Sequence, residues 1–133
     1  MKILKKGEFD SNIYADEMRI EQVIINFITN AIKYAPDGEE IHITTEMRGE
    51  EVYFSVRDFG IGMSEEHQQK VFEKFYRIEE TSARFQGLGI GLYICQEIIE
   101  RHDGMIGANS ILNEGSEFYF QIPAHQKIGV LNN

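Results

Sequence analysis

The spacing of hydrophobic residues along this chain switches between the period of a helix and the period of a strand, and the order of those switches restricts the fold. A helical pattern over residues 16–34 is followed by two-residue alternation over 40–58. A second helical pattern over 88–102 is followed by alternation over 106–122. Strands joined by tight turns pair with their neighbours in the chain, so we expect an α+β fold, an antiparallel-rich sandwich with helices on one face.

The remaining segments set the limits of that domain. A short helix follows Ser64 through about Lys74, an aperiodic loop covers 78–86, and alternation around 9–13 allows one further strand. The basic start, residues 1–7, has the character of a linker stub. We expect three parts: a linker stub and first strand (1–14), one folded domain (15–124) and a C-terminal tail (125–133).

Composition excludes several classes of partner. The 133 residues carry a net charge of −9, which repels nucleic-acid phosphates and anionic membrane surfaces. Cys95 is the only cysteine, so the chain holds no internal disulfide and fits a reducing compartment. Since neither an apolar run of roughly 18 residues nor a signal peptide is present, we expect a cytoplasmic domain without direct membrane contact. Whether a longer parent protein is membrane-anchored stays open.

One polar stripe runs along the first long helix. At about 100° per residue it contains four side chains: Gln22, Asn26, Asn30 and Lys33. Apolar residues flank the stripe: Val23 and Tyr34 on one side, Ile25 and Ile32 on the other. Asparagine is a poor residue within a helix, so the pair at 26 and 30 needs a reason. An amide ligand for Mg²⁺ with a lysine facing phosphates would supply one, and a polar seam bonded to a neighbouring loop is the alternative.

Two glycine-containing segments add to this pattern. Asp58-Phe59-Gly60-Ile61-Gly62 ends a predicted strand, where the carboxylate could accept a hydrogen bond from the amine of adenine and the glycines would admit a flat ring. Gly87-Leu88-Gly89-Ile90-Gly91-Leu92 opens a helix, whose free N–H groups offer a cradle for phosphate. The alternatives are a tight turn for the first segment and a flexible hinge for the second.

A fourth segment lies between these two. Residues 71–75 carry apolar side chains at core spacing, so plain packing explains part of the pattern. Lys74 and Arg77 place positive charge just before the 78–86 loop, which is where a lid closing over an anion would need it. The charge and the loop together favour a role in binding an anionic ligand.

Taken in order, the four segments resemble the ATP-binding catalytic domain of bacterial sensor histidine kinases, within the superfamily shared with gyrase-type, chaperone and mismatch-repair ATPases. The matching segments are 22–34 for its N box, 58–63 for its first glycine box, 72–77 for its F box and 87–92 for its second glycine box. The resemblance covers Glu8 to Pro123. It implies a Bergerat-type two-layer α/β sandwich with a mixed, mostly antiparallel sheet, and ATP held between the first long helix and a mobile lid at 78–86.

The resemblance also implies the site residues, with ATP and Mg²⁺ as cofactors. The catalytic positions would be Asn26, as Mg²⁺ ligand, together with Lys33 and Arg77. Tyr34 would border adenine, Asp58 would accept its amine, and Gly60 and Gly62 would admit the ring. The phosphates would lie against Asn30, Lys33, Arg77, Gly87, Gly89 and Gly91. The same motifs contribute the remaining binding positions: Ile61, Tyr76, Leu88, Ile90 and Leu92.

Gln22 bears on the choice between phosphoryl transfer and hydrolysis. In the hydrolysing branches of the superfamily, a water-activating glutamate lies four residues before the Mg²⁺-binding asparagine, and here that position is Gln22. Glu21 points about 100° away around the helix. We therefore expect transfer to an acceptor rather than ATP hydrolysis.

The resemblance implies an acceptor histidine that this chain does not supply. None of its histidines lies in the acceptor motif of a dimerisation segment: His42, His67, His102 and His125. We therefore expect the catalytic part of a longer kinase, cut at Met1, that phosphorylates a histidine on separate dimerisation helices, with a response regulator downstream. The isolated domain is expected to be a monomer. The alternatives are an anti-sigma-factor-type serine kinase, a superfamily ATPase and a degenerate nucleotide-dependent interaction module.

Overall fold

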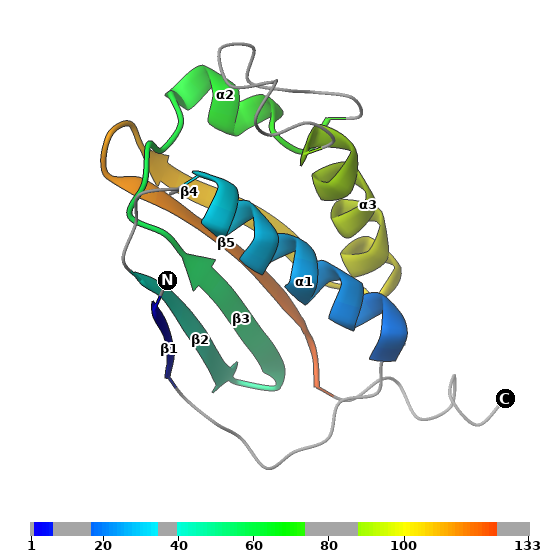
Figure 1. Cartoon of the computed structure of the whole chain (residues 1–133). Coiled ribbons are helices and arrows are strands. Elements are labelled where there is room, and N and C mark those ends of the chain that lie inside the picture. The colour runs from blue at the N-terminus through cyan, green and yellow to red at the C-terminus, as the bar shows by residue number, and fades with distance from the viewer. Residues whose placement is uncertain (1, 7–16, 35–39, 74–87, 125–133) are drawn as a thin grey trace, which may run out of the picture.

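The alternating segments form a single sheet, with its helices on one side (Figure 1). A computed structural model describes residues 2–6, 17–34, 40–73 and 88–124. The elements are β1 (Lys2–Lys6), α1 (Glu17–Tyr34), β2 (Glu40–Arg48), β3 (Glu51–Arg57), α2 (Glu65–Lys70), α3 (Leu88–Arg101), β4 (Met105–Ile111) and β5 (Gly115–Pro123). The strand order is β1-β2-β3-β5-β4, with β1 parallel to β2 and the other neighbouring pairs antiparallel.

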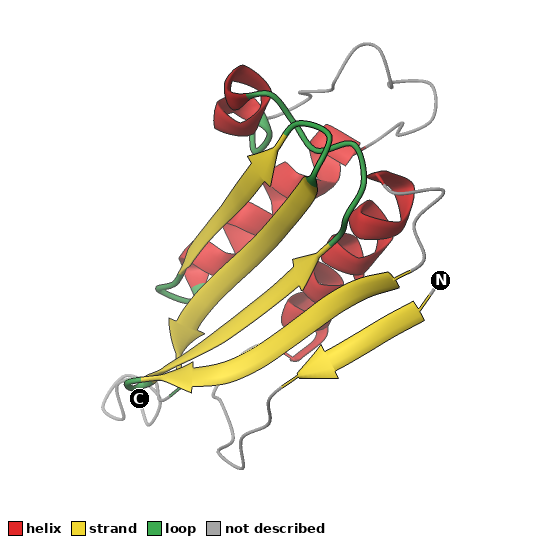
Figure 2. Ribbon diagram, turned by 90° about the vertical axis from the view of Figure 1, so that its left-hand side faces the viewer, coloured by secondary structure: helices red, strands yellow, loops and turns green. Residues whose placement is uncertain are grey.

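The layering agrees with the expected fold class. Figure 2 shows the sheet as one layer and the helices as a second layer behind it. The hairpins β2–β3 and β4–β5 are those that the alternation predicts, and they lie on either side of the β3–β5 pairing. The predicted two-layer α+β sandwich with a mixed, mostly antiparallel sheet is therefore confirmed.

The core forms where the apolar stripe of α1 meets the inner face of the sheet. The buried hydrophobic residues of α1 recur at helical spacing: Ile20, Val23, Phe27 and Ala31. Phe27 packs against three rings of β3 and β5 at centroid distances of 5.8 to 6.4 Å: Phe54, Phe118 and Phe120. Because Asn26 and Asn30 are next to these buried positions in the helix, the same packing fixes where both amides lie.

Two element limits differ from the sequence-based expectation. β1 occupies Lys2–Lys6, where we expect a linker stub, because its parallel pairing with β2 is a long-range contact that the local pattern does not encode. The strand expected around 9–13 lies outside the described residues. α2 ends at Lys70 rather than near Lys74, since the N–H of Glu73 donates to the carbonyl of Lys70 at 2.9 Å and closes a tighter turn.

The helix termini otherwise follow their local signals. Ser64 caps α2 as predicted, and its hydroxyl accepts a hydrogen bond from the N–H of His67 at 3.2 Å. α3 ends at Arg101, close to the predicted end at 102, and Asp103 just after it has a left-handed backbone (φ 61°). Aspartate tolerates that conformation better than most residues do. None of the helices in the described ranges is long and apolar enough to cross a membrane.

Candidate nucleotide site

Three of the predicted segments come together toward one end of the molecule. The carboxyl end of α1, the end of β3 and the start of α3 all lie toward the upper end of Figure 1, and Figure 2 agrees. These ends carry Asn30, Asp58 and Gly91 respectively. The sheet and the two long helices thus bring together residues that are far apart in the sequence.

Asp58 is a fully buried carboxylate whose two oxygen atoms differ in their hydrogen bonding. Its Oδ1 accepts hydrogen bonds from the N–H of Gly60 at 2.9 Å and from the N–H of Ser116 at 3.3 Å. Its own N–H donates to the carbonyl of Ser116 at 2.8 Å. Its Oδ2 is buried and has no partner among the described residues. A buried acceptor without a donor is rare in folded proteins, so this oxygen indicates a ligand that donates a hydrogen bond.

Burial also changes the acidity of this group. Removal from water raises the pKa of Asp58 to about 6, against the hydrogen bonds from the Gly60 and Ser116 N–H groups and the charge of Arg57, which lower it. At neutral pH the carboxylate is therefore mostly ionised and accepts hydrogen bonds only. A donor placed at Oδ2 would stabilise that ionised form.

Asn30 is the second buried polar side chain in the described part of the chain with an atom that has no partner. Asn30 is 3% exposed, and its amide nitrogen Nδ2 has no hydrogen-bond acceptor within the described ranges. Asn30 lies on α1, one helical turn after Asn26. An amide donor kept dry in this way suits an oxygen-rich ligand such as a phosphate group.

Asn26 has a defined orientation. Its Nδ2 donates to the main-chain carbonyl of Gln22 at 3.0 Å, which leaves the Oδ1 atom for another contact. This oxygen faces α3: a Cβ atom placed on Gly91 would lie 2.5 Å from it. The amide oxygen is a hard, neutral ligand, so the donor fits Mg²⁺, and Gly91 leaves the space that it needs.

Two glycines interlock the segment 58–63 with the β4–β5 turn. Gly115 has φ 126°, and a Cβ atom there would overlap the carbonyl oxygen of Asp58. Gly62 has φ 66°, and a Cβ atom there would overlap the carbonyl oxygen of Ile111. Gly62, which the sequence predicts to admit the adenine ring, therefore also has a packing role.

The other predicted site residues lie in varied surroundings. Lys33 is half-buried, Ile61 is exposed, and Leu92 is fully buried in the core. Because α3 begins at Leu88, Gly89 and Gly91 lie within its first turn rather than before it. Six predictions fall outside the described side chains or residues: those on Tyr34, Tyr76, Arg77, Gly87, Leu88 and Ile90. The 78–86 loop is outside as well.

One part of the predicted polar stripe is wrong. Ile25 and Ile32, expected to wall the stripe on one side, are 54% and 42% exposed. The stripe therefore borders the core only on the side of Val23, which is fully buried. The expected wall required a neighbouring element on both sides of the helix, and among the described residues none covers Ile25 or Ile32.

Ser110 and Ser116 are site residues that the sequence reasoning missed. The N–H of Ser116 donates to Asp58, and the two serine hydroxyls lie 2.8 Å apart. A signal was available, because Ser116 is in phase with the buried residues Phe118 and Phe120 of the same strand. A small polar residue at an inward position of an apolar strand is itself a sign of a buried polar contact.

Comparisons with known proteins agree with this geometry. Residues 15–126 match the family model described as histidine kinase-, DNA gyrase B-, and HSP90-like ATPase, and the chain belongs to this family. The adaptive-response sensory kinase SasA of Prochlorococcus marinus is 43% identical over 117 residues, which cover 87% of this chain. The chain spans only 31% of the length of that kinase.

Solved structures give the same assignment. The catalytic domain of histidine kinase ThkA superposes with a TM-score of 0.77 at 36% identity, covering 92% of this chain and 78% of ThkA's. ThkA has also been solved in complex with the response regulator protein TrrA (TM-score 0.74, 34% identity, 92% of this chain and 33% of that one). Full-length ShkA in complex with AMPPNP has a TM-score of 0.78 at 31% identity, covering 92% of this chain and 25% of ShkA.

Proposed function

We propose that this chain is the ATP-binding catalytic domain of a sensor histidine kinase. It binds ATP and transfers the γ-phosphoryl group to a histidine on separate dimerisation helices, for two-component signalling through a response regulator. The observation that carries the proposal is the unpartnered, fully buried Oδ2 of Asp58, in a fold of this family. The likeness to ThkA and the ShkA complex with AMPPNP support it.

The carboxylate of Asp58 accounts for the choice of base. The exocyclic amine of adenine is a hydrogen-bond donor and would satisfy Oδ2, whereas guanine presents an acceptor at the equivalent position. Two acceptors facing each other in a dry site repel, and neither can turn to water. Because Oδ1 is already held by Gly60 and Ser116, the carboxylate cannot rotate away from the base. The site should therefore reject guanine nucleotides strongly.

The side chains of α1 suit the phosphate end of the nucleotide. Asn26 would hold Mg²⁺ through Oδ1, and the bound metal would neutralise phosphate charge during transfer. Asn30 would donate Nδ2 to a phosphate oxygen, and Lys33 would supply positive charge. Arg77 and the N–H groups near Gly87, Gly89 and Gly91 complete the proposed phosphate contacts.

Transfer rather than hydrolysis follows from Gln22. An amide cannot take a proton from water, so the position four residues before Asn26 supplies no general base. A histidine acceptor is itself a nucleophile at neutral pH and needs no base on this chain. The complex of ThkA with TrrA supports a response regulator as the downstream partner.

Calorimetric titration of this domain with ADP and GDP, each with and without Mg²⁺, tests the nucleotide site. We expect saturable one-to-one binding of ADP and much weaker, still measurable binding of GDP. Asn26→Ala should reduce the gain in affinity that Mg²⁺ gives while leaving metal-free ADP binding close to that of the unchanged protein. Equal losses with and without metal would count against the ligand role of Asn26.

The acceptor is tested separately. Radiolabelled ATP, the domain and a purified dimerisation segment of a related kinase should yield a labelled segment whose label is lost in acid, as phosphohistidine is. An acid-stable label would instead favour the serine kinase alternative. Rapid steady-state release of phosphate without the segment would favour an ATPase.

A further inference from the structure

α2 packs against β4, which is an edge strand of the sheet (Figures 1 and 2). The side-chain amide of Gln68 makes this contact specific. Its Nε2 donates to the carbonyl of Ala108 at 2.7 Å, and its Oε1 accepts from the N–H of Ser110 at 3.2 Å. One side chain thus makes the two hydrogen bonds that a neighbouring strand would make to that edge.

The hydroxyl of Ser110 extends the contact toward the site. It accepts a hydrogen bond from the N–H of Met63 at 2.7 Å and donates to the carbonyl of Gly115 at 3.0 Å. It also lies 2.8 Å from the hydroxyl of Ser116. A serine hydroxyl has one proton to donate, so with Ser110 donating to Gly115, Ser116 must donate to Ser110. The Ser110 hydroxyl then uses its donor and both of its acceptor positions.

These bonds hold both ends of the segment that carries Asp58. At one end, the main chain of Ser116 accepts from the N–H of Asp58 and donates to its Oδ1. At the other end, Ser110 holds the N–H of Met63, just before α2 begins. Between them, the carbonyl of Ile61 accepts from the N–H of Asn113 at 2.7 Å.

We propose that Gln68 and Ser110 are positioning residues of the nucleotide site. They fix α2 and the segment 58–63 to the edge of β4, so that the Oδ2 atom of Asp58 stays unpartnered and set for adenine. Ser110 acts through Ser116 and Met63, and Gln68 acts through the main chain of β4, rather than on the nucleotide. Their role rests on the proposed adenine-binding function.

Two variants test this role, and they alter different parts of the contact between α2 and β4. Ser110→Ala removes the hydroxyl, and Gln68→Met keeps the length of the side chain but removes both hydrogen bonds. Gln69→Met, at the exposed neighbouring position on α2, is the matched control. We expect each test variant to weaken ADP binding about tenfold at a temperature where it is fully folded, and the control to bind as the unchanged protein does.

Two further readouts separate positioning from plain stability. The ratio of ADP affinity to GDP affinity should fall in both test variants, because a displaced Asp58 discriminates less well. The combined variant should lose less affinity than the product of the single losses, since the main chain of Ser110 bonds Gln68 while its hydroxyl bonds Met63, so both changes release the same segment. Ser110→Thr, which keeps the hydroxyl, should restore ADP binding.

The outcomes are distinct. If the unchanged domain fails to bind ADP, the proposed function falls, and the positioning role falls with it. If the unchanged domain binds ADP and folded Gln68→Met and Ser110→Ala do the same with an unaltered ADP-to-GDP ratio, only the positioning role is overturned. In that case the bonds serve the stability of the β4 edge alone.

Discussion

The β2–β3 and β4–β5 hairpins have similar turn sequences, but the two turns differ in what packs against them. Each turn is followed or formed by a glycine with positive φ after polar residues: Gly49 lies between β2 and β3, and Gly115 is the first residue of β5. A Cβ atom on Gly49 would meet no atom of the described part of the chain within 4 Å. A Cβ atom on Gly115 would overlap the carbonyl oxygen of Asp58. The first turn only closes a hairpin, whereas the second forms part of the wall of the candidate site.

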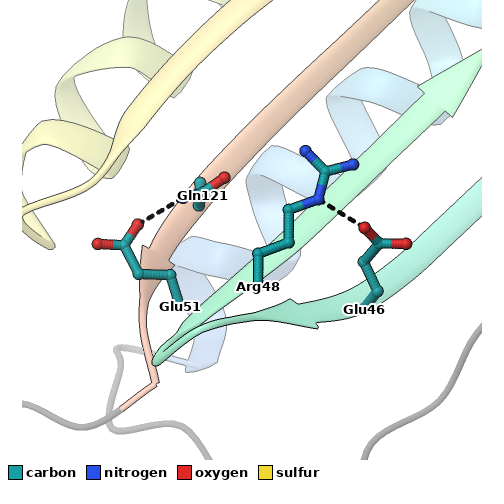
Figure 3. A network of polar contacts seen from close by, with 4 residues as sticks. All are labelled: Glu46, Arg48, Glu51 and Gln121. Atoms are coloured by element: carbon teal, nitrogen blue, oxygen red, sulfur yellow. Dashed lines mark hydrogen bonds and ion pairs between the residues drawn. The ribbon is translucent and has the colours of Figure 1, made fainter.

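The surroundings of the β2–β3 turn agree with this difference. Arg48 donates to Glu46 at 2.5 Å and Gln121 donates to Glu51 at 2.9 Å, and both contacts lie near that end of the sheet (Figure 3). The Arg48 guanidinium lies 3.5 Å from the centre of the Tyr53 ring. An exposed ion pair such as that of Arg48 with Glu46 contributes little to stability. A glycine in a turn therefore does not by itself indicate a functional site. The informative observation is whether another main-chain segment packs against that glycine.

The largest effect is expected from Gly115→Ala. The new methyl group must move the Asp58 main chain, and alanine also resists a φ of 126°. We expect the free energy of unfolding to fall by roughly 3 kcal/mol or more, measured by urea denaturation, with ADP binding weakened in the molecules that remain folded. A loss below about 1 kcal/mol would mean that the turn and the Asp58 segment separate easily, and the contrast between the hairpins would fail.

Asp58→Asn should change ADP affinity and the free energy of unfolding in opposite directions. The N–H groups of Gly60 and Ser116 require an oxygen at the Oδ1 position, so the asparagine NH₂ would replace Oδ2 and oppose the adenine amine with a second donor. We expect ADP affinity to fall roughly a hundredfold or more by calorimetry. The same change removes a buried charge whose pKa is raised from 3.8 to about 6, and it should raise the free energy of unfolding at pH 7.5 by up to about 3 kcal/mol. Lower stability together with intact ADP binding would contradict the assignment.

The pH dependence of binding tests the same carboxylate without a mutation. Because the pKa of Asp58 is raised in the folded protein, its contribution to stability is present below the ordinary pKa of 3.8 and is lost as the pH rises through about 6. Adenine binding has the opposite sign, since the amine prefers the ionised form. Adenosine affinity, measured by competition so that no phosphate titrates, should be about tenfold weaker at pH 5 than at pH 7.5. A flat profile would exclude Asp58 as the acceptor.

The sequence predicts the elements better than it predicts the contacts between them. The limits of α1, β2 and β3 follow from periodicity, because neighbouring residues set it, and Asp58 and Asn26 follow from motifs that are local in sequence. The bond between Met63 and Ser110 joins residues 47 positions apart, and no local pattern encodes it. The same holds for β1, which pairs with β2 across the whole of α1. The hydrophobic pattern of the sequence therefore could not predict the long-range hydrogen bonds that hold Asp58 in place.

The smallest effect is expected from Gly49→Ala. Its φ of 66° makes any side chain with a Cβ unfavourable, but the space around it is open. We expect the free energy of unfolding to fall by about 1 kcal/mol, and Gly49→Asn to lose less because asparagine tolerates this conformation. ADP affinity should not change in either variant, since the turn lies at the end of β3 that is remote from Asp58. A weaker ADP affinity in Gly49→Ala, with normal affinity in Gly49→Asn, would show that strain at one end of β3 reaches the carboxylate at the other, and the two hairpins would then have to be treated as one unit.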